Sequence, residues 1–105
     1  MIVTGWNNGK HNNITGGGYG IEIDPEDRDK YFRRTWTSVV IELDNEDVVG
    51  VTVSPSFWRG CPELRRKEIG KWMLDHRLAP WKGKRPRSRL ELVGHRRFRL
   101  SRLRA

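Results

Sequence analysis

The sequence lacks the features that mark secreted and membrane proteins. Among its 105 residues there is no glutamine and only one cysteine, Cys61. A single cysteine cannot form an intramolecular disulfide, which argues against a disulfide-scaffolded domain and leads us to expect a reducing, cytoplasmic location. The longest apolar run, residues 48–53, is interrupted by Gly50 and Thr52. We therefore expect neither a transmembrane helix nor a signal-peptide core.

Recognisable catalytic motifs are also missing. The glycine-rich run at residues 16–20 precedes a strand-like segment instead of a helix, and no Gly-Lys-Ser/Thr sequence occurs. The run therefore indicates a turn-forming loop and not a dinucleotide or Walker loop. Cys61 with His76 or His95 as base would be a nucleophilic pair, but no spacing supports it, and no His or Cys pair has metal-ligand spacing. No motif set maps onto a family of known function. We predict no catalytic residue, no metal site and no cofactor.

One enzymatic alternative stays open at this point. A metal-dependent nuclease needs convergent carboxylates, and Asp24, Asp27, Glu42 and Asp44 are the candidates. The first two are better explained as acids at the start of a helix, and no lysine completes a Glu-x-Lys motif, so this is the weaker alternative. Whether the four converge depends on the tertiary structure.

The composition predicts a single folded domain over residues 1–105. Only 35% of residues are hydrophobic and 32% are charged, but five Trp, three Phe and two Tyr supply large apolar surfaces for a core. Alternating and β-branched patterns predict strands at 19–23, 38–43, 48–53, 89–93 and 96–103, with a short edge strand at 1–3. Residues 5–18, rich in Gly and Asn, predict a loop.

Helix signals occur twice. Asp24 followed by Pro25 predicts an N-cap and a short helix to about Arg34. Residues 62–77 predict the main amphipathic helix, in which Gly70 allows another backbone to approach closely. The expected fold is therefore α+β: a small antiparallel curved sheet, or a partly open barrel, of about five strands with one main helix.

Charge is unevenly distributed along the chain. The formal net charge is +8. Residues 1–58 hold 5 Lys/Arg and 9 Asp/Glu, a net of −4, whereas residues 59–105 hold 16 and 4, a net of +12. Such a basic half attracts polyanions whatever its fold.

This asymmetry predicts a basic nucleic-acid-binding domain, with RNA and DNA not distinguished. Arginine suits bidentate phosphate contacts, and a tryptophan in the basic segment suits base stacking. The alternative is a protein-interaction or structural domain that pairs with an acidic protein or with a second copy of itself. We expect no membrane partner. The predicted binding residues are Arg65, Arg66, Lys71, Trp81, Lys82, Lys84, Arg85, Arg87, Arg96, Arg97 and Arg99.

Overall fold

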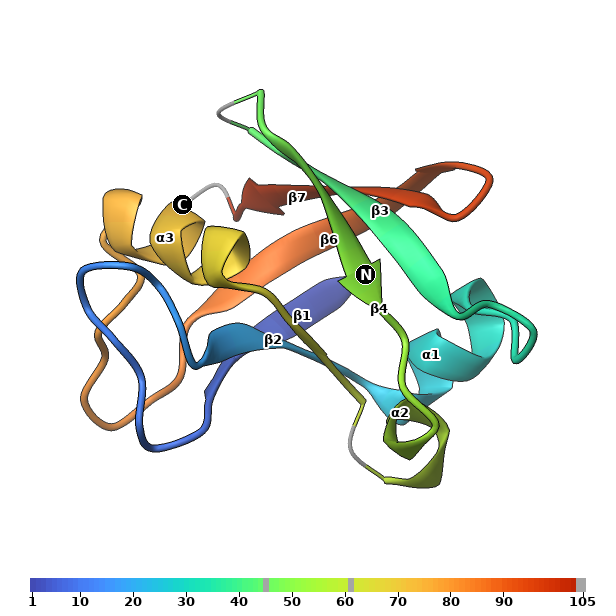
Figure 1. Ribbon diagram of the computed structural model, residues 1–105, viewed down its shortest axis with the longest axis horizontal. Coiled ribbons are helices and arrows are strands. Elements are labelled where there is room, and N and C mark those ends of the chain that lie inside the picture. The colour runs from blue at the N-terminus through green and yellow to red at the C-terminus, as the bar shows by residue number, and fades with distance from the viewer. Residues whose placement is uncertain (45, 61, 104–105) are drawn as a thin grey trace.

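The computed structural model describes residues 1–44, 46–60 and 62–103. Within these ranges, seven strands form one strongly curved sheet, and three helices accompany it (Figure 1). The elements are β1 Ile2–Asn7, β2 Tyr19–Ile23, α1 Pro25–Tyr31, β3 Ser38–Leu43, β4 Val48–Thr52, α2 Ser56–Arg59, β5 Glu63–Arg65, α3 Lys67–Asp75, β6 Arg87–Gly94 and β7 Arg97–Arg102. Among these residues no helix is long and apolar enough to cross a membrane.

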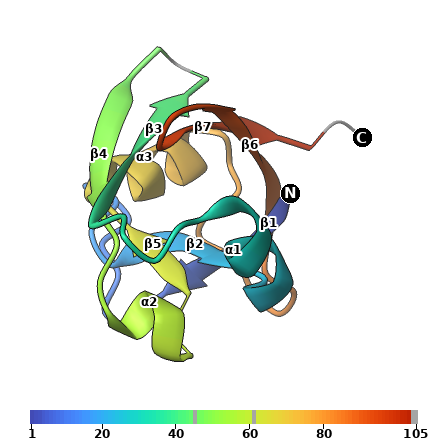
Figure 2. The same cartoon turned by 90° about the vertical axis from the view of Figure 1, so that its right-hand side faces the viewer.

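The sheet curls into a nearly closed barrel. Its strand order is β4-β3-β7-β6-β1-β2-β5, and the two edge strands, β4 and β5, lie close to each other. Figure 2 looks into this curl, with α3 visible across its interior. The α+β class and the partly open barrel are confirmed in this coarse form, but the expected five strands were too few.

Two details of the sheet differ from expectation. β1 extends from Ile2 to Asn7 and lies between β6 and β2, so it is an interior strand, longer than the short edge strand predicted, and the loop begins after Asn7. β3 pairs with β7 in parallel, whereas all other pairs are antiparallel. No hairpin joins β3 to β7, so no tight turn imposes an antiparallel direction on them.

The predicted helix 62–77 is wrong at its start. Glu63–Arg65 form β5 along the edge of β2, and the Ile23 amide donates to the Pro62 carbonyl at 2.8 Å. α3 begins only at Lys67. Leu64 is buried as expected, but it belongs to a strand and not to a helix. A segment of only three residues fits the helical and the strand periodicity equally well, so the pattern could not distinguish them.

The first helix begins as predicted and ends sooner. The Asp24 carboxylate caps α1 by accepting from the Glu26 amide at 2.9 Å, and Pro25 occupies the first turn. Phe32 already has extended backbone angles, so α1 stops at Tyr31 and not at Arg34. The Phe32 ring instead enters the core and stacks on Phe98 with centroids 4.7 Å apart.

One end of the barrel is closed by α3 and by residues 8–18, which we call the asparagine–glycine loop (Figure 1). Ile69, Trp72 and Met73 of α3 are buried in the core. The carboxylate of Asp44, after β3, accepts hydrogen bonds from Trp72 Nε1 and lies 2.8 Å from His76 Nε2. These contacts join the helix to the neighbouring β3–β4 hairpin.

The asparagine–glycine loop is held by its own side chains. Asn8 Oδ1 accepts from the Lys10 amide at 2.8 Å, and Asn12 Oδ1 accepts from the amides of Ile14 and Thr15 at 2.8 and 2.9 Å. These are the local turns that asparagine favours. Ile14 at the tip is 82% exposed.

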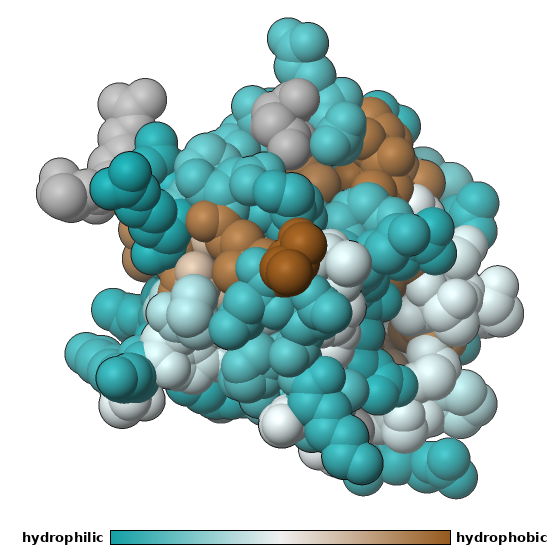
Figure 3. Space-filling view, turned by 60° about the vertical axis from the view of Figure 1, so that its left-hand side comes forward, coloured by the Kyte–Doolittle hydropathy of each residue, from teal (hydrophilic) through white to brown (hydrophobic). Residues whose placement is uncertain are grey.

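On the face of Figure 3, hydrophobic residues gather in small areas separated by hydrophilic ones, so they do not form one continuous apolar patch there.

The loop meets α3 through two glycines. A Cβ on Gly70 would lie 2.0 Å from the Gly16 carbonyl oxygen, and a Cβ on Gly16 would lie 2.3 Å from the Lys71 amide nitrogen. Gly16 also has φ of +85°, which disfavours any side chain. The predicted close approach of a backbone to Gly70 is confirmed.

This contact reverses the effect expected from helix propensity. Alanine at a helix interior normally stabilises by about 1 kcal/mol relative to glycine. We expect Gly70→Ala to destabilise the protein by about 1–3 kcal/mol instead, because the new methyl group displaces backbone. Urea unfolding followed by tryptophan fluorescence measures the change.

The matched control is Gly50→Ala on β4, where no described residue other than its two chain neighbours has an atom within 4 Å of the place that a Cβ would take. That substitution should stabilise by about 0.5–1 kcal/mol, as for an unhindered strand glycine. Equal effects of the two substitutions would contradict the close-contact interpretation.

Candidate nucleic-acid interface

Four arginines occupy the outer face of the β6–β7 hairpin. The alternation of the two strands directs Leu90, Phe98 and Leu100 into the core. The exposed residues on the outer side of the two strands include one acid, Glu91, which is the register partner of Arg99, and four arginines that we call the arginine face: Arg87, Arg89, Arg97 and Arg99. Arg89 was not among the predicted binding residues, although its place next to the inward Leu90 was a sufficient signal.

A carboxylate from the next strand neutralises part of this face. Glu42 of β3 is the register partner of Arg99 and accepts hydrogen bonds from Arg97 Nε and, at 3.1 Å, Arg99 Nε. The Arg97 hydrogen bond is the main cause that lowers the pKa of Glu42, and Arg99 acts in the same direction against the opposing effect of desolvation. Arg97 and Arg99 are therefore partly compensated, whereas neither Arg87 nor Arg89 has an ion pair with another described residue.

The outer face continues onto β1. Ile2 is paired with Arg89, and Thr4 with Arg87. Two residues further along the same face, the half-buried Trp6 is paired with Gly20 of β2, which is paired in turn with Arg65 of β5.

Glycine in the middle of this row lets the two flanking side chains meet. The Arg65 guanidinium lies over the Trp6 ring, 5.4 Å from its centroid. A Cβ on Gly20 would lie 2.4 Å from the Leu64 carbonyl oxygen, so no larger residue fits there. Trp6 thus presents an indole, already paired with a cation, beside the arginine face.

Trp81, one of the predicted binding residues, makes packing contacts. It is half-buried, packs against the core, and lies 5.6 Å from the Tyr19 ring. Pro86 and Trp81 also crowd Gly5, where a Cβ would be 2.9 Å from Pro86 Cγ. Trp81 and Trp6 are both half-buried, but it is Trp6 that lies on the outer face beside the register partners of Arg87 and Arg89. Had the predicted first strand been extended to Asn7, its alternation from the inward Val3 would have placed Trp6 on the outer face.

The remaining predicted residues are dispersed. Three have ion pairs: Arg66 with Glu68 at 2.8 Å, Lys71 with Asp75 at 2.5 Å and Arg85 with Glu22 at 3.1 Å. Lys82 and Lys84 are exposed in the connection between α3 and β6, and Arg96 is exposed in the β6–β7 turn. Only part of the predicted set therefore adjoins the arginine face, and Arg66 and Lys71 lie at α3 instead.

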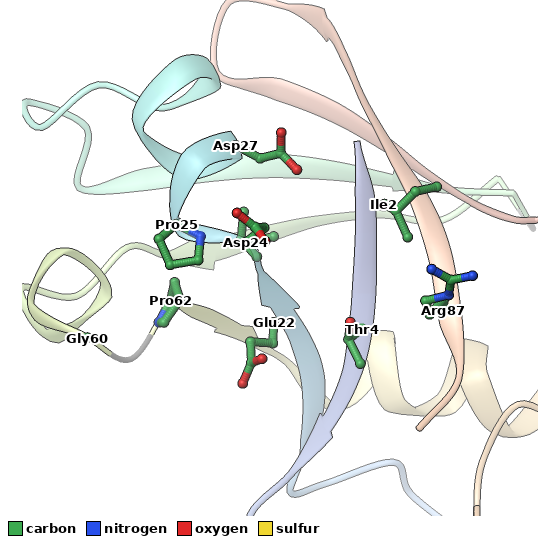
Figure 4. Close-up of a pocket in the computed structure, with 10 residues that line it drawn as sticks. Ile2, Thr4, Glu22, Asp24, Pro25, Asp27, Gly60, Pro62 and Arg87 are labelled. Carbon is green, nitrogen blue, oxygen red and sulfur yellow. The ribbon is translucent and has the colours of Figure 1, made fainter. Parts of the chain in front are cut away.

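An acidic wall limits the arginine face on one side. Beyond β1, a pocket of about 480 Å³ has Arg87 on one flank and Glu22, Asp24 and Asp27 on the other. In Figure 4, Arg87 and the carboxylates of Glu22 and Asp24 lie on opposite sides of β1. The negative charge of these carboxylates opposes the approach of an anion beyond β1.

The four nuclease candidates do not converge. Asp24 caps α1, Glu42 accepts from two arginines, and Asp44 accepts from Trp72. Within the described ranges, no group of three or more His, Cys, Asp or Glu residues could hold a metal ion. The nuclease alternative has no geometric support. The nucleophilic alternative combined Cys61 with His76 or His95. Cys61 lies outside the described residues, His76 contacts Asp44, and the His95 and Trp36 ring centroids are 6.0 Å apart.

The chain matches no protein-family model, and neither a curated protein nor a solved structure matches it.

Glu42 predicts a pH dependence of stability. A carboxyl group with a lowered pKa in the folded state stabilises it fully above its ordinary pKa near 4.5, and this contribution is lost as the pH falls through the lower folded value. We expect wild type to unfold at higher urea than Glu42→Gln at pH 6, with the difference shrinking toward pH 3.

Glu68 provides the internal control for that comparison. Its desolvation is outweighed by its backbone hydrogen bond and by Arg66, so its pKa is lowered as well, and it is present in both proteins. Its contribution cancels between them. A difference between wild type and Glu42→Gln that does not change with pH would show that the arginine pairs are not its source.

Proposed function

We propose that this protein binds nucleic acid through the arginine face of β6 and β7. The observation that carries the proposal is the exposure of four guanidinium groups on two adjacent, hydrogen-bonded strands, of which Arg87 and Arg89 have no ion pair with a described residue. Guanidinium groups bind phosphate through two parallel hydrogen bonds, and their spacing on a sheet is regular.

The indole of Trp6 favours single strands as the ligand. Unpaired bases stack on aromatic rings, and such contacts depend little on which of the bases is stacked. Trp6 shares the outer face of β1 with Thr4, the register partner of Arg87. A strand whose phosphates contact Arg87 and Arg89 has a base within reach of this ring.

An acidic protein, or a second copy of this chain, is the other candidate partner. The acidic wall of Glu22, Asp24 and Asp27 next to Arg87 favours it, because a chain with both charges side by side is complementary to itself in head-to-tail contacts.

Fluorescence anisotropy with labelled single-stranded RNA, single-stranded DNA and duplex DNA, titrated from low to physiological salt, separates these candidates. Binding that persists near physiological salt with a preference for one form supports the proposal. Binding to all three forms that disappears with modest salt reflects net charge alone and favours the protein partner.

The arginine face predicts opposite effects of two sets of variants. Arg87→Gln with Arg89→Gln should weaken binding of the preferred nucleic acid and reduce the slope of log K against log salt by about 0.7 for each phosphate of a single strand that is no longer neutralised. Glu42→Gln should strengthen binding, because it releases Arg97 and Arg99 from their carboxylate.

Arg33→Gln is the matched control, because it also removes one exposed arginine charge but lies in the α1–β3 connection. It should leave both affinity and slope close to those of wild type. Equal losses in Arg33→Gln and in each single substitution at Arg87 or Arg89 would mean that net charge, and not this face, determines binding.

Trp6 tests the preference for single strands. We expect Trp6→Leu to weaken single-strand binding by about 1–3 kcal/mol, the value of one stacked base, and to leave duplex binding unchanged. Arg65→Gln retains the indole and should weaken single-strand binding much less than Trp6→Leu does. Thermal unfolding of each variant verifies that the sheet is intact, and equal losses for single strands and duplex would exclude stacking.

A further inference from the structure

A second pocket lies away from the arginine face, where the α1–β3 connection, the end of β4 and α2 meet. Its volume is about 380 Å³, within the range of small-molecule sites. Two indole rings and two guanidinium groups dominate its lining, with two hydroxyl groups between them. These residues are Trp36, Trp58, Arg34, Arg59, Thr37 and Ser54.

The charge of this pocket has one sign. Its described lining contains two arginines and no carboxylate, in contrast to the acidic wall of the pocket beside Arg87. This is notable because residues 1–58, which supply most of the lining, carry a net charge of −4. A site that concentrates cations within an acidic half of the chain selects an anionic ligand.

Trp58 contacts one arginine of the lining, Arg34, and a second arginine, Arg28, that is not part of the lining. The guanidinium of Arg34 lies 4.8 Å from the centroid of the Trp58 ring. That of Arg28 lies 5.4 Å from the same ring and donates to the Phe57 carbonyl at 3.1 Å. Arg28 is buried and is also paired with Asp29 at 3.0 Å, so its charge is partly compensated and its main effect is to hold the Trp58 ring in place.

The other indole is also fixed. The Trp36 ring contacts the rings of Phe32, His95 and Phe98, with centroids 6.1, 6.0 and 6.4 Å away. It is half-buried, and besides this pocket it lines a neighbouring one. A rigid aromatic wall of this kind binds a planar ring at little cost in conformational entropy.

We propose that this pocket binds a nucleoside monophosphate, with the base against the indoles and the phosphate on Arg34 and Arg59. A purely apolar ligand would remove both guanidinium groups from water without compensation. A bare anion would leave the indole walls unused. The proposal is independent of nucleic-acid binding, because Arg87, Arg89, Arg97 and Arg99 do not line this pocket.

Isothermal titration with AMP and UMP, compared with adenosine and ribose 5-phosphate, tests both parts of this ligand. We expect saturable binding of at least one nucleotide. Adenosine, which lacks the phosphate, and ribose 5-phosphate, which lacks the base, should bind at least roughly tenfold more weakly, since charge-assisted hydrogen bonds and ring stacking each contribute on the order of one such factor.

Variants locate the site. Arg34→Gln and Arg59→Gln should each reduce nucleotide affinity roughly tenfold or more, whereas Arg33→Gln, whose side chain lines the neighbouring pocket, should not. All three positions are exposed, so the fold is retained. No saturable nucleotide binding, equal binding of adenosine, or wild-type affinity in both pocket variants would each overturn the proposal.

The two proposals fail separately. Nucleotide binding that survives Arg87→Gln with Arg89→Gln but not Arg34→Gln assigns the ligand to this pocket. Loss of nucleotide binding only in the arginine-face double variant would overturn the pocket proposal, because the nucleotide would then occupy the polyanion surface.

Discussion

The contact between Gly16 and Gly70 is the constraint on which the rest of this fold depends. It lets the backbone of the asparagine–glycine loop lie directly on α3, at a distance where a Cβ on either residue would overlap main-chain atoms. With the helix held there, Trp72 and Met73 fill the barrel and Asp44 can accept from the Trp72 indole. The composition of this loop is typical of a flexible segment, but its backbone packs on α3 and helps to cover the core.

Closure of the barrel determines which charged groups are neighbours. β3 reaches β7 as a parallel strand, and this pairing brings Glu42 to Arg97 and Arg99 across 55 and 57 residues of sequence. Half of the arginine face is thereby partly neutralised, whereas Arg87 and Arg89, toward β1, have no carboxylate partner in the described part of the chain. The acidic wall at α1 marks the other boundary of the arginine face.

The tryptophans divide into structural and surface roles that follow from strand position. Trp72 is fully buried, and Trp81 covers Gly5 beside Tyr19. Trp6 stands on the outer face because β1 continues past Val3 with strict alternation, and Trp36 and Trp58 border a pocket rich in arginine. That pocket combines residues 34–37 with residues 53–59, two segments that have no shared motif in the sequence.

The sequence by itself determined the α+β class, the β3–β4 and β6–β7 hairpins and the Asp24 cap, because each depends on local periodicity or on a local capping pattern. It indicated that a backbone could approach Gly70, but only the tertiary structure supplied Gly16 as the contact that requires glycine there. Only the tertiary structure decided the parallel β3–β7 pair, the strand at Glu63–Arg65 and the pairing of Glu42 with two arginines. The physical reason is that these features are contacts between segments distant in sequence. Barrel closure selects such contacts, and nothing in the pattern of either segment alone encodes the other as its partner.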